Sequence, residues 1–124
     1  MKEIWKFIDN NHKYMVSNLG RVKNAKTDYV LKARPNKTGY LRVPLFIEGK
    51  HKDLFVHKLV AIAFLKNDDS ETKTQVNHIN CNKLDNTVSN LEWCTPSYNT
   101  KHAFIMNRKS NKGENNPRVK LSYI

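Results

Sequence analysis

The imidazole of His78 and several side-chain amides between residues 76 and 102 are spaced as a hydrolytic site would require. His78 lies in a short apolar stretch predicted as a strand, and Asn90 precedes a second such stretch. Asn99 and His102 follow on a predicted helix, where a separation of three residues places them on one face. An imidazole can accept a proton from water, and amide oxygens can ligate hard divalent cations such as Mg²⁺. The pattern therefore predicts a metal-assisted site that activates water.

Other residues near this pattern have simpler interpretations. Asn82 and Asn86 lie between the predicted strands and are interpreted as turn and loop residues. Cys81 and Cys94 could face each other across the two strands, but in a reducing compartment we expect thiols rather than a disulfide. A zinc site made of both cysteines and a histidine is an alternative that no Cys-x-x-Cys spacing supports. His57 opens an upstream helix and is either structural or a DNA contact.

The elements around the site divide the chain into a basic sheet and a strand–strand–helix unit. Residues 1–56 alternate apolar and polar side chains between turn signals, which predicts a small, mostly antiparallel sheet with a basic outer surface. Further elements are predicted over residues 57–65 (helix), 76–79 and 91–94 (strands), 96–107 (helix) and 110–117 (linker). Thr95 and Pro96 are suited to the N-cap and first turn of the last helix.

Length and charge limit the classes of function. The chain has 124 residues, which is room for one ordinary domain or two very small ones, and its formal net charge is +11. Residues 1–65 carry a net charge of +8 and residues 96–124 of +5, with −2 between them. Two basic arms predict nucleic acid as the partner, and a role in solubility is the alternative. The absence of an apolar run of about 18 residues argues against a membrane span, and two cysteines without a secretory signal favour the cytoplasm.

The site segment resembles the HNH endonuclease family, in the branch of phage homing nucleases whose last metal-site residue is Asn rather than His. The resemblance rests on residues 76–83 (Val-Asn-His-Ile-Asn-Cys-Asn-Lys), 88–99 (Val-Ser-Asn-Leu-Glu-Trp-Cys-Thr-Pro-Ser-Tyr-Asn) and 56–64 (Val-His-Lys-Leu-Val-Ala-Ile-Ala-Phe). Residues 3–24, with Ile4-Trp5-Lys6 and residues 14–22 (Tyr-Met-Val-Ser-Asn-Leu-Gly-Arg-Val), resemble the NUMOD-type DNA-binding module often fused to that family. Together the resemblances cover residues 3–107.

The resemblance implies an α+β fold, in which a small N-terminal antiparallel β-sheet module precedes a ββα-metal (HNH) nuclease motif. It implies a DNA-binding module over residues 1–53, a nuclease domain over 54–107 and a basic linker or tail over 108–124. Residues 113–122 also resemble the lead-in to a C-terminal helical DNA-binding module of the family. We therefore expect a chain that is naturally short or trimmed after Ile124.

The resemblance also implies roles for single residues. His78 corresponds to the general base that activates water, and Asn90 to the residue that orients this histidine through a hydrogen bond. Asn77 and Asn99 correspond to ligands of one divalent cation, Mg²⁺ or Mn²⁺, that bridges protein and scissile phosphate. His102 is expected close to the site, as a further ligand or as a support behind the ligands.

Two departures from the family pattern bear on activity. The turn after the histidine is often Asp-Gly in the family and is Asn80-Cys81 here, and Cys tolerates left-handed backbone angles less well than Gly. Asn77 leaves the cation without an obvious carboxylate ligand. We expect such a neutral site to hold Mg²⁺ weakly until a DNA phosphate adds negative charge.

Three functions are compatible with these observations: a metal-dependent DNA endonuclease, a DNA-binding protein with a decayed nuclease site, and a small basic RNA-binding protein. The first is preferred because the third leaves the spacing of the site residues to chance. Double-stranded DNA in a bacterial or phage-infected cell is the expected partner, bound by a monomer, with a dimer as the alternative. Expected DNA contacts are Arg21, Lys23, Arg42, Lys58 and Lys101.

Overall fold

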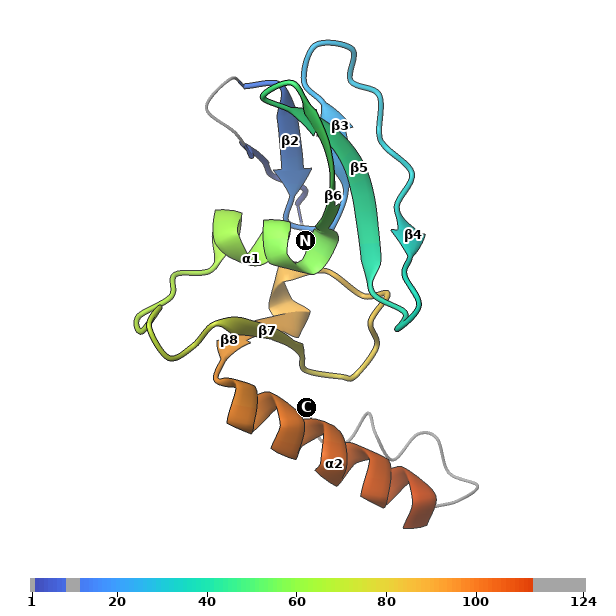
Figure 1. Cartoon of the computed structure of the whole chain (residues 1–124), viewed down its shortest axis with the longest axis vertical. Coiled ribbons are helices and arrows are strands. Elements are labelled where there is room, and N and C mark those ends of the chain that lie inside the picture. The colour runs from blue at the N-terminus through green and yellow to red at the C-terminus, as the bar shows by residue number, and fades with distance from the viewer. Residues whose placement is uncertain (1, 9–11, 113–124) are drawn as a thin grey trace.

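The computed structural model describes residues 2–8 and 12–112, and the regular structure of its first half consists mainly of short strands (Figure 1). The strands are β1 (Trp5–Phe7), β2 (Tyr14–Ser17), β3 (Val22–Asn24), β4 (Arg34–Pro35), β5 (Leu41–Ile47), β6 (Lys50–Phe55), β7 (Gln75–His78) and β8 (Leu91–Cys94). The helical elements are α1 (Val56–Phe64), the 3₁₀ turn η1 (Val88–Asn90) and α2 (Pro96–Lys112). The predicted α+β class is confirmed. No helix in the described residues is long and apolar enough to cross a lipid bilayer.

The N-terminal half forms two antiparallel sheets instead of the single predicted sheet. Strands β1, β2 and β3 make one three-stranded sheet, and β4, β5 and β6 make the other. The two sheets share one core, to which β2 contributes Val16 and β5 contributes Val43 and Leu45, all of them buried. The β5–β6 hairpin closes at the predicted turn, where Glu48 and Gly49 both have positive φ, as a tight two-residue turn requires.

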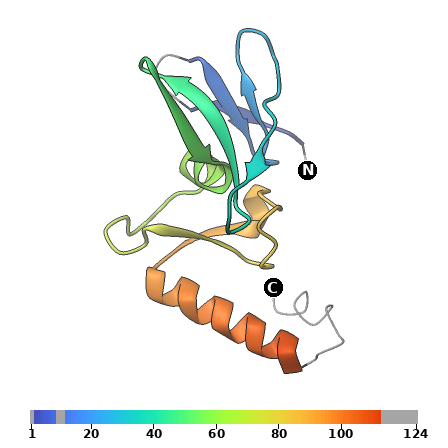
Figure 2. The same cartoon turned by 45° about the vertical axis from the view of Figure 1, so that its right-hand side comes forward.

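Helix α1 joins the two halves of the chain through the same core. It begins one residue before the predicted helix and ends one residue before its predicted end. Its residues Val56, Val60 and Ala61 are completely buried and belong to one cluster with Val76 and Leu91 of the strand pair β7–β8. Figures 1 and 2 show α1 between the sheets and this strand pair. One apolar core therefore extends across the predicted boundary between the DNA-binding module and the nuclease domain, at residues 53 and 54.

Strands β7 and β8 and helix α2 form a ββα unit at the end of the molecule opposite the sheets (Figure 2). The strands are antiparallel, with Asn77 opposite Glu92 and His78 opposite Leu91. Helix α2 runs five residues beyond the predicted helix, because no Gly or Pro interrupts the chain between Ser97 and Lys112. The predicted linker thus begins as helix, and its residues 113–117 lie outside the described residues.

The N-terminal sheet module packs against the loop between β7 and β8. Gly20, in the turn after β2, has a φ of +90°, and an added Cβ would lie 3.0 Å from the Asn86 Cβ and 3.1 Å from the Asn86 carbonyl oxygen. The Asn18 carbonyl accepts a hydrogen bond of 2.8 Å from the Val88 backbone N–H. The turn after β2 and the loop between β7 and β8 therefore lie so close together that no side chain fits at position 20.

We expect Gly20→Ala to reduce the free energy of unfolding more than Gly49→Ala. Both glycines have positive φ, which costs an alanine on the order of 1 kcal/mol. A Cβ at Gly49 meets nothing within 4 Å, whereas one at Gly20 presses on Asn86, which adds about 1–3 kcal/mol. Urea unfolding of the two variants measures the difference. Equal losses of stability would show that this contact is not tight.

Candidate active site

His78 is a buried side chain at the end of β7, with 5% of its surface exposed. Its Nε2 lies 2.7 Å from the Asn86 side-chain oxygen. Because an amide oxygen only accepts hydrogen bonds, Nε2 is the nitrogen that carries the proton. In the neutral ring, Nδ1 then keeps its lone pair. Burial lowers the pKa of His78 below its ordinary value, although the bond to Asn86 and the nearby Asp85 carboxylate oppose this. The neutral, proton-accepting form is therefore favoured.

Asn90 does not make the predicted hydrogen bond to His78. Its side-chain NH₂ donates to the Asp85 carbonyl at 2.9 Å, and its oxygen accepts from the Asn80 backbone N–H at 3.0 Å. Asn90 ends the 3₁₀ turn η1, and this position directs its amide into the loop between β7 and β8. The predicted hydrogen bond from Asn90 to His78 is therefore wrong. The loop between β7 and β8 brings Asn86 to the imidazole instead, while Asn90 stabilises the loop itself.

Asn86 is the residue near the site that sequence reasoning missed. It was interpreted as a loop residue, but it is buried, with 4% of its surface exposed, and it holds His78. Its type and position give no signal that separates it from neighbouring loop asparagines such as Asn82. Only the folded path of residues 79–90, which passes so close to Gly20 that no side chain fits at position 20, brings the Asn86 side chain to the imidazole.

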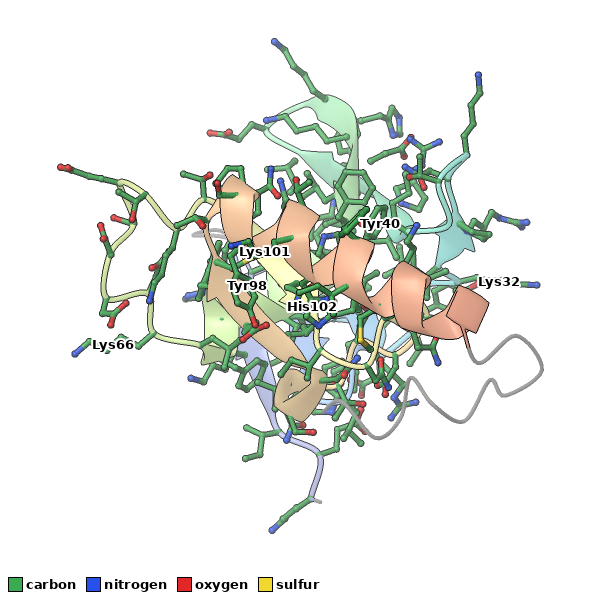
Figure 3. The ribbon with its side chains drawn as sticks, turned by 90° about the horizontal axis from the view of Figure 1, so that it is seen from below. Lys32, Tyr40, Lys66, Tyr98, Lys101 and His102 are labelled. Atoms are coloured by element: carbon green, nitrogen blue, oxygen red, sulfur yellow. The ribbon has the colours of Figure 1, made fainter. Side chains whose placement is uncertain are left out.

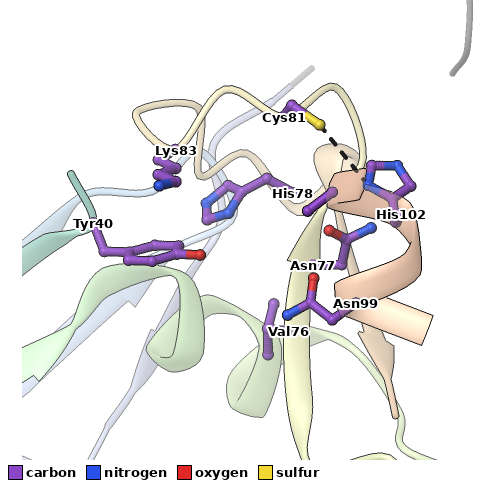
Figure 4. A pocket seen from close by; sticks show the side chains of 9 residues that line it. Tyr40, Val76, Asn77, His78, Cys81, Lys83, Asn99 and His102 are labelled. Carbon is purple, nitrogen blue, oxygen red and sulfur yellow. Dashed lines mark hydrogen bonds between the residues drawn. The ribbon is translucent and has the colours of Figure 1, made fainter. Parts of the chain in front are cut away.

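Asn77 and Asn99 both have their NH₂ groups bound, so their oxygens remain available. The Asn77 NH₂ donates to the Glu92 carboxylate at 2.7 Å, across the β7–β8 pair. A carboxylate only accepts, which fixes the orientation of this amide. The Asn99 NH₂ donates to the Gln75 side-chain oxygen at 2.8 Å. In Figure 4 the Asn99 oxygen points toward Asn77. Gln75 and Glu92 therefore hold the two amides so that the Asn77 and Asn99 oxygens remain available as ligands.

These side chains line one pocket between β7, the following loop and α2, shown in Figure 4. It encloses about 180 Å³ and also contains Cys81, Lys83 and His102, with Tyr40 from the end of the β4–β5 loop. The Lys83 ammonium lies 4.8 Å from the centre of the Tyr40 ring and donates to the Thr38 carbonyl at 2.8 Å. The structure thus brings His78, Asn77, Asn99 and His102 together in one pocket. It also places the positively charged Lys83 side chain there.

His57 lies beneath the pocket and not on the outer surface. Its ring centre is 5.0 Å from that of His78 and 5.1 Å from that of Tyr40. Its Nδ1 is buried and has no hydrogen-bond partner among the described residues. Burial, the neighbouring His78 and Lys58 together lower the pKa of His57 to about 3. Of the two predicted roles, this placement favours the structural one.

The residues expected to contact DNA lie on several faces. Arg21 and Lys23 flank the Trp5 ring, at 5.4 Å and 4.3 Å from its centre, and each pairs with an acid, Glu3 or Asp28. Arg42, Lys58 and Lys101 are exposed. Lys58 lines a second pocket that also contains His57, Tyr40 and Asn99. Figure 3 shows Lys101 on α2 beside Tyr98 and His102.

The fold and the pocket together define a β-sheet module joined to a ββα unit that presents two imidazoles and two amides. Two family models match the chain, the NUMOD4 motif over residues 3–46 and HNH endonuclease over residues 55–101. DNA endonuclease I-HmuI of Bacillus phage SP01 is 40% identical over 89 residues, which is 72% of this chain and 50% of that protein. The solved structure of the HNH homing endonuclease I-HmuI superposes with a TM-score of 0.74 at 35% identity, over 94% of this chain and 67% of that one.

The chain belongs to the HNH endonuclease family, as the sequence resemblance indicated. Another relative, the uncharacterized HNH endonuclease L247 of Acanthamoeba polyphaga mimivirus, is 50% identical over 106 residues, 82% of this chain. This match spans only 26% of the mimivirus protein, and a second mimivirus relative is covered over 28% of its length. The activity of the whole protein therefore does not follow from family membership alone.

We expect the buried His57 to make stability depend on pH. In the unfolded chain its pKa is near 6.5, whereas in the fold it is about 3, so only the unfolded chain gains a proton between these values. The free energy of unfolding therefore falls as pH is lowered below about 6.5, by about 2 kcal/mol between pH 7 and pH 5. Urea unfolding at both pH values, for the wild type and His57→Phe, measures this. The variant should lose less stability, and an equal loss in both proteins would contradict the assignment.

Proposed function

We propose that the chain is a metal-dependent DNA endonuclease of the homing type, which hydrolyses phosphodiester bonds in double-stranded DNA. The observation that supports this most is the neutral His78, held by Asn86, in one pocket with the oxygens of Asn77 and Asn99. The second support is membership in a family named for this activity. Nothing in a purely DNA-binding protein would require a buried histidine with an available ring nitrogen beside two oriented amides.

His78 is the proposed general base. Its Nδ1 accepts a proton from a water molecule, whose oxygen forms a bond to phosphorus while the bond from phosphorus to the leaving sugar oxygen breaks. Asn86 holds Nε2–H and so keeps Nδ1 as the accepting atom. It also stabilises the imidazolium that forms, because its oxygen accepts the bond from the charged ring. Asn86 is therefore a positioning residue for His78.

Asn77 and Asn99 are the proposed ligands of one divalent cation, Mg²⁺ or Mn²⁺. Their donor atoms are hard, neutral oxygens, and their NH₂ groups are already bound to Glu92 and Gln75, so the chemistry of the pair fits such an ion. When bound, the cation stabilises negative charge that develops on the phosphate. Since neither ligand carries a charge, the phosphate of bound DNA supplies the negative charge that balances the cation.

Residues 1–53 are proposed as the DNA-binding module, residues 54–107 as the nuclease domain and residues 108–124 as a basic tail. Arg42, Lys58 and Lys101 are exposed and contribute phosphate contacts, while Arg21 and Lys23 first have to exchange their acidic partners for phosphate. A monomer, with one site, nicks one strand, whereas a dimer of the chain would cut both strands and make a double-strand break. The substrate is the DNA of a bacterial or phage-infected cell, met in the cytoplasm.

A DNA-binding protein with a decayed site is the second candidate, favoured by one observation. Cys81 follows His78 in a left-handed conformation, with a φ of +63°, where a glycine would be unstrained. Cleavage of plasmid DNA in Mg²⁺ distinguishes the candidates: conversion of supercoiled to nicked circles supports the endonuclease, and binding without any conversion supports the second candidate.

His78→Ala is expected to lower the cleavage rate by at least about 10²-fold, because it removes the general base. Affinity for DNA should change little, since it depends on dispersed contacts between basic side chains and phosphates. His51→Ala is the control, because His51 is an exposed histidine on β6 remote from the pocket. Plasmid nicking and filter binding measure the two quantities. Cleavage at the wild-type rate by His78→Ala would overturn the mechanism.

Substitutions at Asn99 are expected to change the Mg²⁺ dependence of cleavage. Asn99→Ala removes an oxygen ligand, so more Mg²⁺ is needed and the maximal rate falls. Asn99→Asp adds a negative ligand, so tighter Mg²⁺ binding without DNA and some residual activity are expected. Thr100→Ala, at an exposed neighbouring position on α2, is the control. Three superimposable curves of rate against Mg²⁺ for wild type and both Asn99 variants would exclude Asn99 as a ligand.

A further inference from the structure

Cys81 occupies a strained backbone position at the pocket. Its φ of +63° lies in the left-handed region, which costs a side chain other than glycine on the order of 1 kcal/mol. Cys81 is half-buried and lines the pocket, and it is not a residue of the apolar core. A strained residue that lines a functional pocket indicates a role for its side chain.

The Cys81 thiol faces an imidazole, a second type of zinc ligand, across the pocket. Its Sγ lies 3.8 Å from Nδ1 of His102 on α2, the contact drawn as a dashed line in Figure 4. A zinc ion has bonds of about 2.3 Å to sulfur and about 2.0 Å to nitrogen, and a tetrahedral angle places these two atoms roughly 3.6 Å apart. The pair is therefore already spaced as two ligands of one ion.

The other donors of the pocket are of a different chemical kind. Asn77 and Asn99 present hard oxygens, whereas a thiolate and an imidazole select a borderline or soft ion. Cys94 is buried and lies opposite Gln75, at the end of the β7–β8 pair away from His78, so it is not placed to join Cys81. No cluster of three or more His, Cys, Asp or Glu ligands occurs in the described residues. An ion held by Cys81 and His102 alone thus has further coordination positions that water or phosphate oxygens can fill.

We propose that Cys81 and His102 form a second cation site, for Zn²⁺, at the same pocket as the Mg²⁺ site. Zn²⁺ binding releases the thiol proton to solvent and leaves the ion with two protein ligands. Because the pair lines the pocket with His78, Asn77 and Asn99, bound Zn²⁺ occupies space that the scissile phosphate needs. Zn²⁺ therefore inhibits cleavage in Mg²⁺. This inhibition, but not the binding of Zn²⁺, rests on the proposed function.

Direct titration tests the site without DNA. Zn²⁺ is added to the whole protein in competition with a chromophoric zinc chelator, for the wild type, Cys81→Ser, Cys81→Gly and Cys94→Ser. Loss of one of two ligands should weaken Zn²⁺ binding by at least about tenfold in both Cys81 variants. Cys94→Ser should bind as the wild type does. Cys81→Gly also relieves the backbone strain, so its loss of binding cannot be attributed to unfolding. Equal affinity in all four proteins would overturn the proposal.

Thiol labelling gives an independent measurement. In the Cys94→Ser protein, Cys81 is the single cysteine, and its reaction with a maleimide is followed by mass spectrometry. Zn²⁺ should slow this reaction at least about tenfold, whereas Mg²⁺ should not, because a thiolate ligand prefers the softer ion. His102→Ala should remove the protection. Protection that persists in His102→Ala would overturn the assignment of His102 as the second ligand.

Cleavage assays then test the inhibition. The ratio of rates with and without Zn²⁺, at fixed Mg²⁺, should be low for the wild type and Cys94→Ser and near one for Cys81→Gly. The same ratio in the wild type and Cys81→Gly would overturn inhibition through this site. A wild type that cleaves in neither Mg²⁺ nor Mn²⁺ would refute the proposed function and the inhibition with it. The titration and the labelling would still decide whether the zinc site exists.

Discussion

The buried hydrogen bond between His78 and Asn86 is the contact on which the rest of the site depends. It decides which ring nitrogen carries the proton, and therefore which nitrogen of His78 keeps the lone pair that the proposed general base needs. Asn86 can hold the ring only if the loop after β7 keeps its path, and Gly20 of the N-terminal module lies so close to Asn86 that a side chain at position 20 would collide with it. The geometry of the proposed general base is thus coupled to the N-terminal module through one side chain and one glycine.

A second constraint is that both proposed ligands of the hard cation are neutral. Asn77 and Asn99 offer oxygens because Glu92 and Gln75 accept hydrogen bonds from their NH₂ groups. The Glu92 carboxylate therefore orients the Asn77 amide, so that the amide oxygen is the atom offered to the cation. A site of this kind depends on substrate phosphate for its negative charge, which links metal binding to DNA binding. The Lys83 ammonium over the Tyr40 ring favours the same anion at the pocket.

Much of the architecture could be predicted because local signals were strong. The α+β class, the turn at Glu48-Gly49, the helix near residues 57–65 and the strand–strand–helix unit all followed from periodicity and turn residues. Errors arose where pairing between distant segments decides the outcome. The strands of residues 1–56 divide into two sheets, and their grouping depends on how two hairpins pack over one core. The predicted end of α2 was too early, although the sequence lacks a helix breaker before Gly113.

Periodicity, spacing and charge were enough to predict the types of chemistry available: one histidine at the end of a strand, amides at the spacing of a ββα unit, and a charge suited to nucleic acid. Which amide serves which purpose depends on how the chain folds. Asn90 holds the loop and Asn86 holds the imidazole, and Cys81 meets His102 across 21 residues of chain. These contacts form only when the two polar atoms come within about 3 Å of each other, or somewhat farther for sulfur. Such distances between loop residues are set by the packing of Gly20, α1 and α2 around the loop, which no local pattern encodes.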